Sequence, residues 1–136
     1  MNNHQLLELL KTDIDKFNQY RKDNPKQGID FKKADLQGAN FRCANLRHAN
    51  LQDADLREAN LQDADLQDAD LEDADLREAD LKCADLRKAN LRDADARGAN
   101  FSWASLAGAK MQLMKIYKSQ KNTIILSLGL LEHENE

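Results

Sequence analysis

Most residues in this chain that could do chemistry are carboxylates and arginines at regular spacing. Three aspartates spaced 20 residues apart are each followed two residues later by an arginine, in the pairs Asp55–Arg57, Asp75–Arg77 and Asp95–Arg97. Paired carboxylates act as acid and base when burial or a close neighbour shifts one pKa. Here the charges alternate with other polar residues throughout, which is typical of a solvated surface. The pattern therefore favours a charged interaction surface over a catalytic site.

Other catalytic groups are few and scattered. The histidines are His4, His48 and His133, and we expect none of them to reach Ser102, Ser105 or Ser127 as a base. The glycines do not form a phosphate-binding loop, because those at 38, 98 and 108 stand singly. The sequence therefore predicts a protein that is not an enzyme and needs no cofactor.

The sequence repeats every five residues, and the structure of this repeat must position the charged side chains. Alanine recurs every five residues from Ala34 to Ala109, and an apolar residue follows two positions later, from Leu36 to Met111. Neither a helix nor a strand fits this period: a helix would carry successive centres about 140° apart, and a strand would place them on opposite faces. The chain must instead turn a corner in every repeat, so that all the apolar side chains face one axis. This arrangement is a solenoid.

These repeats, such as Ala-Asp-Leu-Gln-Gly and Ala-Asn-Phe-Arg-Cys, resemble the pentapeptide repeat family with its pattern A(D/N)LXX. The resemblance covers residues 29–111 and implies an all-β solenoid, a right-handed quadrilateral β-helix with four pentapeptides in each coil and about four coils. It also suggests a small bacterial protein of the cyanobacterial type. We divide the chain into a capping helix and turn (1–28), the β-helix (29–113) and an apolar C-terminal segment (114–136).

Residues 4–23 predict one amphipathic helix, because Leu6, Leu10 and Phe17 recur with helical spacing. Asn24-Pro25 should end the helix, since a residue before proline disfavours the helical conformation. An open coil end is an exposed sheet edge that invites aggregation, so we expect the helix to cover it. Membrane or partner binding by this helix is the alternative, but the mixed charges of its polar face fit an ordinary solvated face better.

The C-terminal segment is the most apolar part of the chain. Residues 112–122 could form a short helix, and residues 123–131 suit a strand or a buried segment. This segment could cap the last coil, form a homodimer contact, or do both. The candidate dimer residues are Ile124, Ile125, Leu126, Leu128, Leu130 and Leu131.

Two outward faces follow from stacking residues 20 apart, the register that the resemblance implies. The first is a mixed-charge ladder whose candidate interaction residues are Arg57, Arg77 and Arg97, with Glu58 and Glu78 beside them. The second, which we call the acidic column, consists of Asp53, Asp73 and Asp93. Both patterns also have a simple structural explanation, because corner aspartates bond to the backbone and mixed charges keep a flat β surface soluble.

The two cysteines, Cys43 and Cys83, occupy equivalent outward positions two coils apart. That separation is about 10 Å, whereas a disulfide needs Cα atoms within about 7 Å. We therefore expect two free thiols. A tetrahedral zinc site would need four converging ligands, and the register brings no such set together.

The charge balance limits the classes of partner. The formal net charge is −4, which argues against direct nucleic-acid binding. Neither a membrane span nor a signal peptide is evident, so we expect a cytoplasmic protein. Three functions remain open. The leading hypothesis is a non-enzymatic scaffold that binds an unidentified protein. The alternatives are a DNA mimic that inhibits or protects DNA gyrase or another topoisomerase, and a chiefly structural protein that self-associates.

Overall fold

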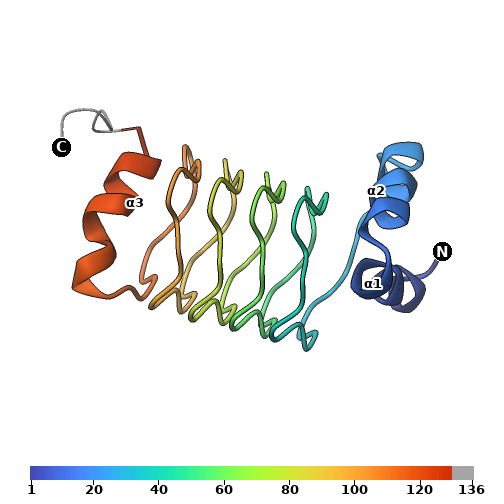
Figure 1. The fold of residues 1–136 in the computed structure, drawn as a ribbon, viewed down its shortest axis with the longest axis horizontal. Helices are drawn as coiled ribbons and strands as arrows, with labels where there is room; N and C mark the ends of the chain where they lie inside the picture. The colour runs from blue at the N-terminus through green and yellow to red at the C-terminus, as the bar shows by residue number, and fades with distance from the viewer. Residues whose placement is uncertain (130–136) are drawn as a thin grey trace.

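The computed structural model describes residues 1–129 as a solenoid with helices at both ends (Figure 1). Two helices, α1 (Asn3–Thr12) and α2 (Ile14–Asp23), lie at the N-terminal end. A short 3₁₀ helix, η1 (Lys118–Gln120), leads into α3 (Lys121–Ser127) at the opposite end. Across the described residues, no helix is long and apolar enough to cross a bilayer.

The coils are joined by parallel backbone bridges between residues that are 20 positions apart. The bridges run from Asp30↔Asn50 to Asp95↔Lys115, in steps of one pentapeptide. Four pentapeptides therefore complete one coil, and every outward position recurs one coil further along the same face. Lys115 still pairs with Asp95, so the register continues two residues past the expected boundary at residue 113.

Each corner is stabilised by the aspartate or asparagine that precedes the central apolar residue. Its side chain accepts a hydrogen bond from the amide two residues later, as in the 3.2 Å bond from Arg77 to Asp75. The sequence prediction that these residues bond to the backbone at corners is confirmed. The last residue of each repeat has a positive φ, for example 57° at Asp53, and this feature was not predicted. Glycine at the equivalent positions 38, 98 and 108 was the available signal, because glycine adopts positive φ without strain.

The interior holds stacked leucines and alanines, as the period predicted. Leu51, Leu71 and Leu91 are 0% exposed, and the neighbouring alanines from Ala44 to Ala94 are 0–1% exposed. Phe41 and Phe101 are equally well buried near the two ends of the solenoid. Close packing of identical side chains gives the solenoid one continuous hydrophobic core.

The prediction of a single N-terminal helix over residues 4–23 was wrong. The backbone of Asp13 is extended (φ −154°, ψ 90°), so this residue ends α1 and begins α2. Its side chain accepts a hydrogen bond from the Lys16 amide, as the first residue of a helix often does. The break lets both helices contribute to the core, where Leu6, Leu10 and Phe17 are at most 1% exposed.

Side chains of α2 pair with the open edge of the first coil. The Asn18 side chain donates to the Cys43 carbonyl (2.9 Å) and accepts from the Asn45 amide (2.8 Å). Arg21 donates to the Asn45 carbonyl (3.3 Å) and the Arg47 carbonyl (2.6 Å). These groups satisfy edge positions that another coil would otherwise occupy, and so they discourage edge-to-edge aggregation.

Within the C-terminal segment, residues 121–127 form the helix α3 and not a strand, and this helix begins later than the short helix expected at residues 112–122. Ile124 of α3 is 7% exposed. The Gln120 side chain donates to the carbonyls of Ala96 (2.8 Å) and Ala99 (3.0 Å), and Ser127 Oγ donates to the Phe101 carbonyl (3.1 Å). These contacts cover the last coil. The dimer contact remains a prediction, and its members Leu130 and Leu131 lie outside the described residues.

Candidate interaction surface

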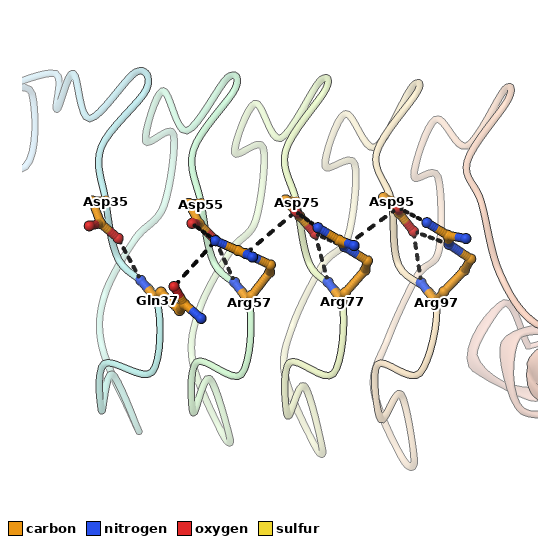
Figure 2. Close-up of polar contacts among 8 residues, drawn as sticks. All are labelled: Asp35, Gln37, Asp55, Arg57, Asp75, Arg77, Asp95 and Arg97. Carbon is orange, nitrogen blue, oxygen red and sulfur yellow. Dashed lines mark hydrogen bonds and ion pairs between the residues drawn. The ribbon is translucent and has the colours of Figure 1, made fainter.

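The mixed-charge ladder is built from one Asp–Arg pair in each of three successive coils (Figure 2). In each pair the guanidinium folds back onto the carboxylate of its own repeat. Arg77 donates from Nε to Asp75 Oδ1 (2.9 Å) and from Nη2 to Oδ2 (2.7 Å). The pairs Asp55–Arg57 and Asp95–Arg97 have the same bidentate geometry, with nitrogen–oxygen distances of 2.6–2.9 Å. Such paired charge-assisted bonds fix the orientation of the guanidinium plane.

The pairs are also linked from coil to coil. Arg57 Nε lies 3.6 Å from Asp75 Oδ2, and Arg77 Nε lies 3.7 Å from Asp95 Oδ2. At the N-terminal end of the ladder, Arg57 Nη2 donates to Gln37 Oε1 (3.2 Å). The side chains therefore form a continuous network along the face, as Figure 2 shows.

This network shifts the protonation equilibria of both partners. The hydrogen bond from Arg77 lowers the pKa of the Asp75 carboxyl, and Arg57 and Arg97 do the same for Asp55 and Asp95. The same bonds raise the pKa values of the arginines. The three aspartates and the three arginines are consequently charged at neutral pH, and the face presents fixed alternating charges.

A hollow of about 290 Å³ runs along this ladder. Its lining comprises Arg57, Glu58, Arg77, Glu78, Arg97 and Tyr117. Glu58, Glu78 and Gly98 occupy equivalent positions in three successive coils, and the Glu78 carboxylate fills the space that a side chain at Gly98 would need. Tyr117 is 50% exposed and was not predicted as part of this surface, because it follows the last regular repeat.

The acidic column lies along a line of corners. Asp53, Asp73 and Asp93 are exposed, and their φ angles lie between 57° and 59°. The Asp53 amide donates to the Glu72 carbonyl of the next coil (3.0 Å), so the backbone holds the column in register while the carboxylate faces solvent. Lys33 occupies the equivalent corner before the column and Leu113 the one after it, which limits the column to three charges.

Cys43 and Cys83 are both exposed and free, as predicted. Among residues 1–129, no group of three or more histidine, cysteine, aspartate or glutamate side chains could hold a metal ion. The surface assembled here therefore consists of charged and hydrogen-bonding groups on a rigid backbone.

Comparison with known proteins identifies the repeats. The family model for pentapeptide repeats matches eight copies, over residues 27–63, 54–93 and 84–113. A pentapeptide repeat protein of the Arabidopsis thaliana thylakoid lumen has 34% identity over 72% of each chain, with a TM-score of 0.53. HetL, a pentapeptide repeat protein involved in heterocyst differentiation regulation in the cyanobacterium Nostoc, has 39% identity over 68% of this chain and 44% of HetL, with a TM-score of 0.39. No curated protein matches.

A third structure resembles this chain more distantly. QnrB1, a plasmid-mediated fluoroquinolone resistance protein, has 17% identity over 76% of this chain and 68% of its own, with a TM-score of 0.44. The family match and the thylakoid protein together imply that the solenoid is a right-handed β-helix.

Proposed function

Because this chain belongs to the pentapeptide repeat family, we propose that it is a non-enzymatic module that binds another protein through its mixed-charge ladder. In this proposed module the β-helix is quadrilateral with about four coils, a geometry that the 20-residue register of the bridges supports. One flat side then carries the ladder, at a coil spacing of about 4.8 Å. The partner is an unidentified protein.

The observation that carries this proposal is the fixed geometry of the arginines. Free surface arginines lose rotamer freedom when they bind, whereas Arg57, Arg77 and Arg97 are already held by their aspartates. In residues 1–129 the side-chain hydrogen bonds of Arg77 use Nε and Nη2, so its Nη1 group can serve a partner. Arginine is also enriched at protein–protein interfaces. The ladder therefore offers directed donors at little entropic cost.

Site-specific photocrosslinking in cells of the source organism tests the proposal. A photoreactive residue at Glu58 or Glu78 should capture the same protein, because both positions line the ladder hollow. Substituting glutamine for Arg57, Arg77 and Arg97 should abolish this capture. Arg87→Gln is the matched control, since Arg87 forms the same bidentate pair with Asp85 on another face. Equal loss in the control, or capture of different proteins from the two positions, would contradict the proposal.

DNA mimicry towards gyrase or another topoisomerase is the second candidate, and the acidic column is the feature that favours it. One charge in each coil amounts to one per about 4.8 Å, whereas duplex DNA carries one per about 1.7 Å of its axis. The column therefore supplies roughly a third of the charge density of DNA. The ladder on the neighbouring face also intersperses arginines. These two differences favour protein binding through the ladder over mimicry.

Self-association through the C-terminal segment is the third candidate. Ile125, Leu126 and Leu128 of the candidate dimer segment are only partly buried. Light scattering tests whether the full-length chain is a dimer. Aspartate at Ile125 and Leu126 should convert a dimer into a folded monomer if this segment forms the contact, because a buried unpaired charge is costly.

A further inference from the structure

A second hollow, of about 620 Å³, lies between the C-terminal half of α2 and the first coil. We call it the cap hollow. Its lining comprises Asn18, Arg21, Lys22, Pro25, Asn45, Arg47 and His48. It lies on a different surface from the ladder, and no step of the proposed function uses it.

Arg21 brings a buried positive charge to this hollow. The residue is 6% exposed. Its hydrogen bonds within residues 1–129 all go to carbonyls, at Gln27 (2.8 Å), Asn45 (3.3 Å) and Arg47 (2.6 Å). Burial lowers the pKa of the Arg21 guanidinium, although an arginine stays charged in proteins. Carbonyl dipoles satisfy the N–H donors without neutralising the charge, and a buried charge is costly unless it is paired.

The rest of the lining adds to this positive charge. Lys22 and Arg47 are exposed cations, His48 contributes an imidazole, and among residues 1–129 no carboxylate lines the hollow. Two carboxylates of the next coil form ion pairs with the lining: Asp65 Oδ2 lies 3.7 Å from Arg47 Nη1, and Asp68 Oδ2 lies 4.0 Å from His48 Nε2. Three cationic side chains, Arg21, Lys22 and Arg47, thus line one hollow of a protein whose net charge is −4.

We propose that the cap hollow binds the phosphate group of a small phosphorylated molecule. A phosphate dianion can accept charge-assisted hydrogen bonds from Lys22 and Arg47 while it offsets the buried charge of Arg21. Asn18 positions the site. The nitrogen of its side-chain amide donates to the Cys43 carbonyl and the oxygen accepts from the Asn45 amide, so the side chain holds α2 against the first coil. The hollow exceeds the size of a bare phosphate ion, so an organic group such as a sugar is accommodated beside it.

The test is a titration of the full-length protein with inorganic phosphate, in which NMR records the backbone amide shifts. Sodium chloride keeps the ionic strength constant throughout the titration. Saturable shifts should be confined to residues 18–25 and 43–48. Lys22→Gln and Arg47→Gln should each weaken binding about tenfold or more, because each removes a charge-assisted hydrogen bond. These exposed residues can be replaced without disturbing the Arg21 contacts, so the fold should be retained.

Two matched controls separate a built site from general charge. Lys16→Gln lies on the same helix outside the lining, and Arg87→Gln changes the residue two coils along from Arg47. Both variants should bind phosphate as the natural sequence does. The proposal is overturned if phosphate produces no saturable shifts beyond those of chloride, or if the control variants lose as much affinity as the site variants.

Discussion

Leu66→Ala tests whether the solenoid interior is a rigid ladder of side chains. Leu66 is 0% exposed and lies in a column between Leu46 and Leu86, whose side chains are at most 1% exposed. The coils above and below are fixed by short backbone bonds, 2.7 Å from the Leu66 amide to the Asp85 carbonyl and 2.8 Å from the Leu46 amide to the Asp65 carbonyl. Collapse into the vacated volume would stretch these bonds.

The expected loss of unfolding free energy follows from this geometry. Buried leucine-to-alanine changes cost about 2–5 kcal/mol, and the cost rises with the volume of the cavity that remains. Because the bridged coils cannot close the gap, we expect a value in the upper part of that range, about 3–5 kcal/mol. This is a large share of the roughly 5–15 kcal/mol that stabilises a typical domain.

Urea unfolding followed by circular dichroism measures this loss. Leu113→Ala is the matched control, because the same atoms are removed from a side chain that is 79% exposed; its effect should stay within about 0.5 kcal/mol. A loss below about 1 kcal/mol for Leu66→Ala would refute the reasoning, since it would mean that the coils repack around the missing atoms.

The remaining predictions concern the ladder, the C-terminal cap, the acidic column and the thiols. Arg77 lowers the folded-state pKa of Asp75. The pair should therefore stabilise the protein above about pH 4, the pKa of an unfolded aspartate, and this stabilisation should be lost as the pH falls through the folded-state pKa. In the Arg77→Gln variant, the pKa of Asp75 measured by NMR should rise. A chain that ends at Ser119 lacks the Gln120 bonds and α3, so it should unfold at a lower urea concentration and scatter light as aggregates. A variant with asparagine at all three positions of the acidic column should be crosslinked through the ladder as the natural sequence is. If the column instead mimics DNA, the same variant should lose any effect that the protein has on supercoiling by gyrase. Iodoacetamide should label both cysteines under native conditions, since both thiols are exposed and free.

The repetitive part of the fold could be predicted because one physical constraint recurs in every pentapeptide. A buried leucine such as Leu71 and a buried alanine such as Ala69 keep the same place in each repeat, so the sequence period reports the corners directly. Stacking at 20 residues then brings Arg57, Arg77 and Arg97 into one row, and the coil-to-coil distances place them there. The bidentate geometry of the Asp–Arg pairs was not predicted, although an arginine two residues after an aspartate in three successive coils was its signal.

The ends could not be predicted as well, because tertiary contacts decide their structure. Asp13 is a favourable first residue for a helix, yet in the sequence this signal competes with a continuous apolar stripe. The break leaves Leu6, Leu10 and Phe17 buried in the core, which is a tertiary effect. Isoleucine and leucine in residues 123–128 suit a strand or a helix; the bonds of Ser127 to the last coil are made by a helix. The burial of Arg21 was not predicted, because two of the three carbonyls to which it donates belong to Asn45 and Arg47, more than 20 positions away.

The way the ends are closed also determines where ligands can act. Asn18 and Arg21 occupy hydrogen-bonding positions of the first coil, and Gln120 and Ser127 do so at the last, so a partner that adds a strand to either end must displace these side chains. A partner that binds a lateral face need not displace these side chains, which is why a protein partner is better placed on the ladder. A phosphate in the cap hollow, by contrast, would bind only while α2 is docked. By linkage it should therefore stabilise the N-terminal cap, and slower hydrogen exchange in α2 would reveal this effect.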